Sequence, residues 1–427
     1  MTASTETLPT PSDIELDALR AVVTADLPAY LDDLRRLVDI DCGSYTPAGV
    51  DEVGRWVTAF LAGLGAEIET RPDPSGRLGA TVIASFHGQA GGPRALLIGH
   101  MDTVFDPGTA AERPFRVDDG VAYGPGVTDM KSGLLAGLYA LKAIITERGG
   151  LPFERVVFIA NPDEEIGSPT STAHIREVAL DSDVALVLEC ARANGDIVSA
   201  RKGILDLRIV VHGRAAHAGV EPEKGRSAIL EASRIVRDLH ELNGRWPDVT
   251  VNVGLIGGGT RPNVVADRCS LEVDVRAVTR DALESAEAEV RRIAEATEIP
   301  DTTVDFEPMA RWWPMERLER SGRLVDHARA VSAALGFDVG EASTGGASDA
   351  NTTSGLGIPS LDGLGPIGGN DHSPAEYLDV DSIVPRTTML AGLLVAIAGD
   401  PEVLAWRAER ADGVAADAAS GDATRPG

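Results

Sequence analysis

Residues 96–104 have the sequence Leu-Leu-Ile-Gly-His-Met-Asp-Thr-Val, an apolar run that ends at His100, with Asp102 two positions further on. A short run of Leu and Ile bounded by polar residues is typical of a buried strand in a parallel sheet. In an open α/β sheet, ligands and catalytic groups gather at the carboxyl ends of the strands. We therefore expect His100 and Asp102 to lie at such an edge.

The same arrangement, in which an acid or a histidine follows an apolar run, recurs along the chain. It places further candidate ligands at Asp129, Glu164, Glu165, Glu189 and His372. Imidazole and carboxylate groups together are typical ligands of Zn²⁺, although Co²⁺ or Mn²⁺ could replace it. The recurrence therefore indicates a carboxylate-rich metal site.

Each of these residues also has an ordinary structural explanation. His100 and Asp102 would form a simple hydrogen bond, and Asp129 would cap the helix that follows it. Glu189 would cap the edge of the sheet, and His372 would be a turn histidine. The adjacent Glu164 and Glu165 are more informative, because one carboxylate can bind a metal while its neighbour moves a proton. That division suits hydrolysis, where a water activated by a metal still needs a base.

Composition limits the class of protein. The chain has 427 residues, 43% of them hydrophobic, and a net charge of −27, which argues against nucleic acid or an anionic membrane as partner. Three scattered cysteines are too few for a disulfide framework or a cysteine-rich zinc module. No apolar run reaches the length of a membrane span, and the N-terminal residues lack the pattern of a secretory signal. The expected location is the cytoplasm.

Hydrophobic periodicity changes twice along the chain. Before residue 200, strands alternate with helices, including a helix over 14–37 that we expect Pro28 to interrupt, and residues 107–125 have the pattern of a loop. Strands at 204–211, 249–256 and 271–278 then alternate apolar and polar residues, as in an antiparallel sheet with one face in water, and helices are expected at 227–242 and 280–296. The α/β pattern returns near Leu318.

We therefore predict an α/β protein in which a mostly parallel sheet is interrupted by an inserted α+β domain. The predicted bounds are 13–200 and 316–410 for the catalytic domain and 201–315 for the insertion, with disordered tails at 1–12 and 411–427.

Other chemical motifs are missing from the sequence. His240-Glu241 lacks the second histidine of a His-Glu-x-x-His zinc motif, and neither a Gly-x-Ser-x-Gly elbow nor a phosphate-binding Gly-Lys loop occurs. Residues 363–368 match the dinucleotide pattern formally, but Pro366 stands where an amide should face phosphate and no helix pattern follows. We reject that match.

The motifs together resemble the dinuclear zinc exopeptidases and deacylases, a family that includes glutamate carboxypeptidases, aminoacylases, acetylornithine deacetylase and succinyl-diaminopimelate desuccinylase. The resemblance rests on Gly-His-Met-Asp-Thr at 99–103, Gly-Val-Thr-Asp-Met-Lys at 126–131, Asp-Glu-Glu-Ile-Gly at 163–167 and His372-Ser373. Ser-Asp-Ala-Asn at 348–351 and Leu-Asp-Gly-Leu-Gly-Pro at 361–366 are most similar to the bacterial glutamate carboxypeptidase branch.

The resemblance implies two Zn²⁺ per subunit. His100 and Glu189 would hold one ion, Glu165 and His372 the other, and Asp129 would bridge them.

It also implies roles around the metals. Glu164 would be the general base, Asp102 would orient His100, and the peptide bond between Asp129 and Met130 would be cis. Cys190 departs from the family, because proline often occupies the position after the glutamate ligand.

The inserted domain resembles a lid that also forms a homodimer. In such lids a histidine, here His217, reaches the partner subunit's site and stabilises the oxyanion. Asn263, Arg276 and Arg311 match positions that relatives use to bind the far end of the substrate.

The sequence thus predicts a dizinc hydrolase that cleaves the amide bond to a C-terminal amino acid, preferably glutamate. An N-acyl-amino-acid amidohydrolase or a dipeptidase is the alternative within the enzyme class. A non-catalytic binding protein is the alternative outside it, but such a protein has no chemical need for the complete set of ligands together with Glu164.

Overall fold

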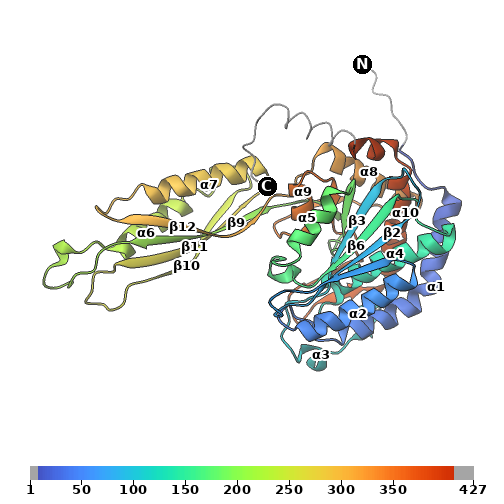
Figure 1. Cartoon of the computed structure of the whole chain (residues 1–427), viewed down its shortest axis with the longest axis horizontal. Coiled ribbons are helices and arrows are strands. Elements are labelled where there is room, and N and C mark those ends of the chain that lie inside the picture. The colour runs from blue at the N-terminus through green and yellow to red at the C-terminus, as the bar shows by residue number, and fades with distance from the viewer. Residues whose placement is uncertain (1–7, 408–427) are drawn as a thin grey trace, which may run out of the picture. The chain divides into compact units, whose positions relative to one another are not determined.

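The structure is a computed structural model that describes residues 8–407 and divides the chain into two compact units. Within the described residues, unit 1 comprises 8–199, Arg317–Ala342 and 348–407, and unit 2 comprises Ala200–Glu316 and Ser343–Ala347 (Figure 1). Each unit has its own hydrophobic core. Of the predicted tails, residues 1–7 and 411–427 lie outside the described residues, whereas Ser12 caps the first helix through the amide of Glu15.

The main sheet of unit 1 has six strands in the order β1-β2-β6-β3-β7-β14. Strands β3, β6, β7 and β14 run parallel, and β2 pairs antiparallel with both β6 and β1, so the predicted α/β class is confirmed. The strands are β1 Glu67–Arg71, β2 Thr81–His87, β3 Arg94–His100, β6 Arg155–Asn161, β7 Val184–Val187 and β14 Ser360–Leu361. Although β2 and β3 are consecutive, β6 lies between them.

Helices pack around this sheet. Helix α4 contacts β3, α1 and α10, while α2 packs against β2 and α9 against β7. The helices are α1 Asp13–Val38, α2 Pro47–Gly63, α3 Thr109–Glu112, α4 Ser132–Arg148, α5 Thr172–Leu180, α8 Glu319–Ala334, α9 Asp349–Gly355 and α10 Ile383–Ala398.

Two local predictions for unit 1 were wrong. Helix α1 continues through Pro28, which lies on the exposed side of the helix, where water can bind the carbonyl group that loses its helical donor. The predicted loop at 107–125 contains α3, β4 Arg116–Asp118 and β5 Val121–Tyr123. Strands β4 and β5 belong to a small sheet, completed by β15 Gly368–Gly369 and β16 Tyr377–Asp379, in the order β15-β16-β5-β4.

Unit 2 is an antiparallel sheet in the order β10-β11-β9-β12 with two helices, as predicted for the insertion. Strand β12 was missed because most of its residues are exposed and it contains Pro308, so it lacks the alternating pattern. The elements are β9 Gly203–His212, α6 Ala228–His240, β10 Thr250–Gly258, β11 Arg268–Ala277, α7 Arg280–Glu295 and β12 Thr303–Trp312. A separate two-stranded pair joins β8 Ile197–Arg201 to β13 Glu341–Thr344.

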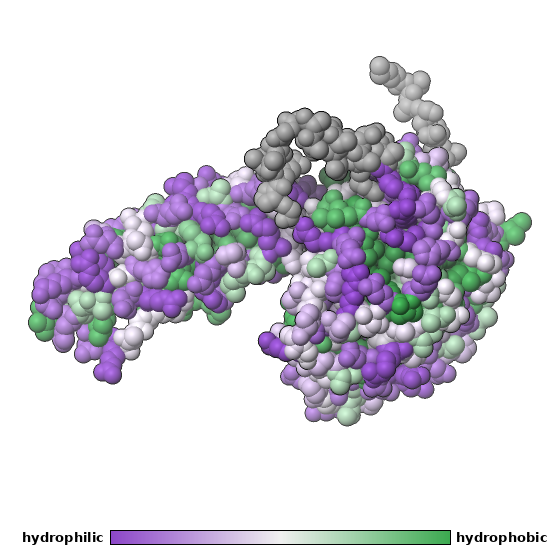
Figure 2. All heavy atoms as spheres, viewed as in Figure 1, coloured by the Kyte–Doolittle hydropathy of each residue, from purple (hydrophilic) through white to green (hydrophobic). Residues whose placement is uncertain are grey.

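One segment, Val380–Ala398, is long and apolar enough to cross a membrane by length and composition, with a mean hydropathy of 1.5. However, 78% of that window is buried inside the protein, and α10 packs against α1, α4 and α8. Its apolar character therefore serves the core of unit 1. The molecular surface seen in Figure 2 is mainly hydrophilic, in agreement with the high content of acidic residues.

The contact between α4 and the chain after β7 is close enough to test. A Cβ atom added to Gly133 would lie 1.8 Å from the carbonyl oxygen of Leu188, whereas one added to Gly63 would meet nothing within 4 Å. We expect Gly133→Ala to lower the free energy of unfolding by about 2 kcal/mol or more, as for overpacked cores. Gly63→Ala is the matched control and should be neutral or stabilising by about 0.5–1 kcal/mol. The measurement is the urea midpoint, and equal midpoints for the two variants would contradict the close contact.

Candidate metal centre

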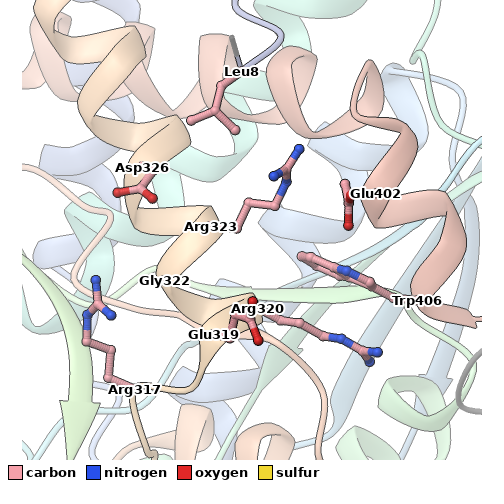
Figure 3. Close-up of a pocket in the computed structure, with 9 residues that line it drawn as sticks. All are labelled: Leu8, Arg317, Glu319, Arg320, Gly322, Arg323, Asp326, Glu402 and Trp406. Carbon is pink, nitrogen blue, oxygen red and sulfur yellow. The ribbon is translucent and has the colours of Figure 1, made fainter. Parts of the chain in front are cut away.

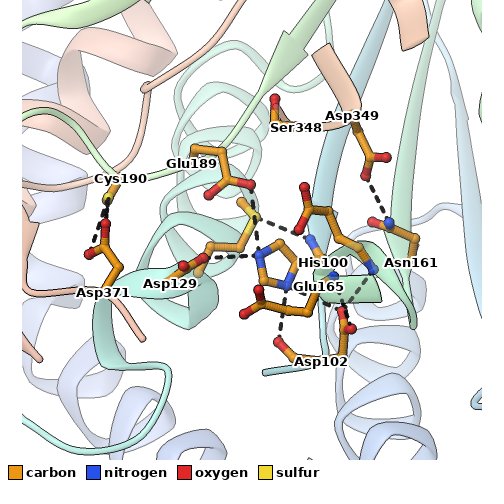
Figure 4. A network of polar contacts seen from close by, with 12 residues as sticks. His100, Asp102, Asp129, Asn161, Glu165, Glu189, Cys190, Ser348, Asp349 and Asp371 are labelled. Carbon is orange, nitrogen blue, oxygen red and sulfur yellow. Dashed lines mark hydrogen bonds and ion pairs between the residues drawn. The ribbon is translucent and has the colours of Figure 1, made fainter. Parts of the chain in front are cut away.

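The candidate ligands of unit 1 meet at the carboxyl edge of its parallel strands. His100 ends β3 and lies opposite Asn161, the last residue of β6. The turn Glu164–Ile166 follows β6 closely, and Glu189 lies two residues beyond β7. The parallel register therefore brings Glu164 and Glu189, which are 64 and 89 positions from His100 in the sequence, to the same edge of the sheet as His100. Figure 4 shows Glu189 beside His100.

His100 is nearly inaccessible, with 1% of its side chain exposed. Its Nε2 atom lies 3.1 Å from Oδ1 of Asp129 and 3.7 Å from Oε1 of Glu189. Its Nδ1 atom lies 3.0 Å from the backbone carbonyl oxygen of Asp102 and 3.3 Å from Oδ1 of the same residue. With Nδ1 held by Asp102, Nε2 is the nitrogen that faces the carboxylates.

Asp102 does more than orient His100. Its carboxylate is fully buried and accepts a hydrogen bond from the hydroxyl of Ser44 (2.6 Å). It also accepts the backbone amides of Glu164 (3.1 Å) and Glu165 (3.3 Å). One side chain therefore fixes both the imidazole and the turn that carries the two glutamates.

Asp129 lies between the two candidate histidines. Its Oδ1 atom is 3.1 Å from Nε2 of His100, and its Oδ2 atom is 3.0 Å from Nε2 of His372. The peptide bond from Asp129 to Met130 is cis, as the resemblance implies. The loop before it turns at Gly126, whose φ of +71° favours glycine.

His372 reaches this cluster from a loop in which it adopts a φ of +60°. Its Nε2 atom also lies 3.1 Å from Oε2 of Glu165, and 55% of its side chain is exposed. The other oxygen of Glu165, Oε1, is buried and has no hydrogen-bond partner among residues 8–407. A buried carboxylate oxygen without a donor beside it is costly unless a cation binds it.

The pKa values of the cluster also indicate that positive charge is stabilised at this place. Burial opposes the positive charge of His100, yet hydrogen bonds to Asp102 and Asp129 raise its pKa well above the usual range. Burial likewise opposes the negative charge of Asp129, but hydrogen bonds from both histidines keep its pKa below the usual value. Hydrogen bonds to Asp129 and Glu165 raise the pKa of His372 to about 10. The two imidazoles thus supply the positive charge that a divalent cation would supply at the same place.

Among residues 8–407, two groups of three side chains have ligand atoms within 4.8 Å of one another: His100 with Asp129 and Glu165, and His100 with Glu164 and Glu189. This set of imidazole nitrogens and carboxylate oxygens suits Zn²⁺ and related divalent ions. The unpaired Oε1 of Glu165 and the converging lone pairs fit a metal centre. Glu164 also lies within ligand distance, although the resemblance assigns it to proton transfer.

Several residues of the site were not found from the sequence. The carboxylate of Asp349 accepts hydrogen bonds from Ser168 and Asn161, both at 2.7 Å, and burial raises its pKa to about 6. The buried carboxylate of Glu376 accepts three backbone amides of the loop at 126–129, and burial raises its pKa to about 7. A pattern read along the chain gives no signal for such contacts, because the partners are far apart in sequence.

Cys190 adds a thiol next to the cluster. Its Sγ atom is buried and lies 4.0 Å from both carboxylate oxygens of Asp371. Burial raises the pKa of the thiol well above its usual value, which disfavours the thiolate form that binds zinc.

The remaining predicted residues belong to unit 2. His217 and Asn263 lie side by side, because the backbone amide of Ala218 donates to the carbonyl oxygen of Asn263 and His217 pairs with Val264. The Nδ1 atom of His217 accepts the amide of Gly219 at 3.2 Å.

The two predicted arginines of unit 2 already have protein partners. Arg276 binds the carboxylate of Asp274 (3.1 Å) and the carbonyl oxygen of Gly345 (2.9 Å). Arg311 pairs with Glu287 and stacks over Trp313, 5.0 Å from the ring centre.

A separate pocket of about 690 Å³ lies on unit 1 beside α8 (Figure 3). Two of its three arginines form ion pairs within the protein, Arg317 with Glu341 and Arg323 with the buried Asp400, and Arg320 lies over the ring of Trp406. It is lined by none of the candidate ligands.

Comparison with known proteins gives a consistent result. Residues 96–396 match the model of peptidase family M20/M25/M40. Carboxypeptidase G2 from Pseudomonas sp. strain RS-16 is 32% identical over 384 residues, which cover 89% of this chain and 92% of that protein. Acetylornithine deacetylase from Proteus mirabilis strain HI4320 is 30% identical over 268 residues, 58% of this chain and 67% of that protein. The crystal structure of aminopeptidase PepT from Bacillus cereus ATCC 10987 superimposes with a TM-score of 0.75 at 24% identity, covering 87% of this chain and 99% of that one.

Proposed function

The chain belongs to peptidase family M20/M25/M40 and is a metallopeptidase of that family, and we propose that it is a carboxypeptidase that hydrolyses the amide bond to a C-terminal glutamate or a similar residue. The observation that carries this proposal is the convergence of His100, Asp129 and His372 with the adjacent pair Glu164 and Glu165. Similarity to carboxypeptidase G2 over 89% of the chain supports the choice of bond.

In this proposal, His100 and Glu189 would hold one zinc ion, Glu165 and His372 would hold a second, and Asp129 would be a ligand common to both. The short distances among these side chains support this assignment. When bound, the ions polarise the scissile carbonyl group and lower the pKa of the attacking water.

Glu164 takes the proton of the water and delivers it to the leaving nitrogen. Its side chain lies in the same cluster, and the amide of Glu164 is fixed by Asp102, so the base is held beside the reacting atoms. Burial and neighbouring acids raise the pKa of Glu164, and a carboxyl group with a raised pKa retains a proton long enough to donate it. Asp102 keeps both His100 and Glu164 in place.

Adjacent glutamates allow a direct test of this division. We expect Glu164→Gln to lower kcat by about 10²- to 10⁴-fold, the range for loss of a general base, while the metal content stays at the wild-type value. Glu165→Gln is the matched variant one residue away and should lose metal, because it removes a ligand. The measurement is elemental analysis of each dialysed protein together with kcat. A loss of metal from Glu164→Gln would make Glu164 a ligand and refute the proposed division.

The substrate class is tested with a panel of peptidyl and N-acyl amino acids. We expect kcat/KM to be highest for substrates with a C-terminal glutamate and to fall when the α-carboxylate is amidated. The second candidate function, hydrolysis of N-acyl amino acids, is favoured by the similarity to acetylornithine deacetylase. Faster turnover of acetylated neutral amino acids than of peptidyl glutamates would favour that candidate and exclude the carboxypeptidase.

Unit 2 acts as a lid and a dimer surface in this proposal. It exposes large apolar side chains on α6 and on the edge strand β10, among them Leu230 (58% exposed), Leu255 (63%) and Ile256 (55%). Exposed apolar groups beside an unpaired strand edge favour association with a second copy. His217 then stabilises the oxyanion in the partner's site, and Asn263, Arg276 and Arg311 bind the far end of the substrate.

The cytoplasm is the proposed location. Cys42, Cys190 and Cys269 are all buried and free, which agrees with a reducing compartment.

The role of His217 is tested by subunit mixing. His217→Ala should lower kcat by about 10²-fold, as removal of an oxyanion donor does in other enzymes. Mixed with Glu164→Gln subunits, it should regain activity, because each heterodimer contains one site with an intact Glu164 and an intact His217. Verified heterodimers without any recovery would refute sharing between subunits.

A further inference from the structure

Glu376 is buried directly behind the proposed bridging ligand. Only 1% of its surface is exposed, and its carboxylate accepts the backbone amide of Gly126 through Oε2 at 2.8 Å. Its other oxygen, Oε1, accepts the amides of Thr128 at 2.9 Å and Asp129 at 3.1 Å. One side chain therefore satisfies three amide donors of the loop that ends in Asp129.

The same short segment also holds the side chain of Asp129. His372, four residues before Glu376, lies 3.0 Å from Oδ2 of Asp129 through its Nε2 atom. Residues 372–376 thus contact Asp129 at its backbone amide and at its carboxylate. Strand β16 begins directly after Glu376 and pairs with both β5 and β15, so the segment is anchored in the small sheet.

The amides of Gly126, Thr128 and Asp129 in this loop donate to Glu376 instead of to the backbone of a helix. The backbone at Asp129 and Met130 has non-helical φ and ψ angles. The regular hydrogen bonds of α4 therefore do not extend back into this loop. Packing around it is close: a Cβ atom on Gly368 would lie 2.0 Å from the hydroxyl oxygen of Thr128. Without an acceptor from Glu376, three amide groups in this packed region would lose their hydrogen bonds.

We infer that Glu376 is a positioning residue that sets the affinity of the metal centre by fixing the backbone of Asp129 relative to His372. This inference rests on the proposed function only in taking Asp129 and His372 as metal ligands. Residues that orient metal ligands through hydrogen bonds contribute about 10- to 100-fold to metal affinity in other proteins. Asp102 holds the side chain of His100 and the main-chain amide of Glu165, whereas Glu376 holds Asp129 by its main-chain amide.

Glu376→Gln is the informative variant. Both carboxylate oxygens are acceptors here, so an amide nitrogen in place of either one would face an N–H donor and lose at least one contact. The protein is stripped with a chelator, and Co²⁺ is titrated into it while visible absorption and heat are recorded. We expect the dissociation constant for Co²⁺ to rise by about 10- to 100-fold. Excess Co²⁺ should then restore part of kcat.

A matched control separates this role from a purely structural one. Glu231 in unit 2 is also fully buried and accepts two loop amides, those of Glu298 (3.0 Å) and Ile299 (2.8 Å). Glu231→Gln should lower the melting temperature without changing the Co²⁺ titration. If Glu376→Gln behaves in the same way, Glu376 only supports the fold and the inference is refuted.

A conservative variant and the wild-type titration complete the experiment. If Glu376→Gln does not fold, Glu376→Asp is titrated instead, and it should weaken Co²⁺ binding because the shorter side chain cannot reach all three amides. Wild-type affinity in a folded Glu376→Asp protein would overturn the inference. Failure of the proposed metal centre gives a different result, since the wild-type protein itself would then bind no Co²⁺ at this site.

Discussion

Four carboxylates, those of Asp129, Glu164, Glu165 and Glu189, surround the imidazole of His100 at one edge of a sheet, and their mutual repulsion is the constraint that the rest of unit 1 must satisfy. Like charges at such distances disfavour ionisation of all members at once. Burial raises the pKa values of Glu164 and Glu165, and repulsion by neighbouring acids raises them further. A site of this kind is stable only when positive charge lies among the acids.

The fold holds these side chains in place through their backbones as well as their side chains. Asp102 accepts the amides of Glu164 and Glu165, and Glu376 accepts the amide of Asp129. In each case a carboxyl group that is not a proposed ligand accepts the main-chain amide of a residue of the cluster. Such contacts fix geometry without removing a lone pair from the ligand carboxylate, which leaves those oxygens available to a cation.

The sequence was most informative about structural features that depend on a local pattern of residues. The apolar run at 96–99 predicted β3, and the positions of His100, Glu164 and Glu189 after strands followed from the general rule that parallel strands end at one edge. The antiparallel sheet of unit 2 was likewise visible in the alternation of β9 and β11.

Features that depend on contacts between distant segments could not be predicted in this way. The sequence contains no local sign that Ser44 binds Asp102 or that Glu376 binds the loop at 126–129, since these partners are 58 and about 250 positions apart. Pro28 was taken as a break because local propensity disfavours proline within a helix, but burial of Tyr30 and Leu34 against the core outweighs the loss of one hydrogen bond. Strand β12 was missed because most of its side chains are exposed, so it has no pattern of buried residues. Its position is set by hydrogen bonding to β9.

The proposed catalytic residues and the proposed substrate-recognition residues lie in different units of the chain. All the proposed metal ligands and the proposed base lie in unit 1, on strand ends and loops tied to its core. The proposed recognition residues lie in unit 2, where His217 and Asn263 share one pair of loops and Arg276 and Arg311 already bind acidic neighbours. An arginine that is paired with Asp274 or Glu287 must exchange that partner for a substrate carboxylate, so its contribution to affinity is the difference between two ion pairs of similar strength. Asn263 has no charge to exchange. On this argument, the proposed preference for glutamate would depend more on the pair of loops that carry His217 and Asn263 than on the two arginines.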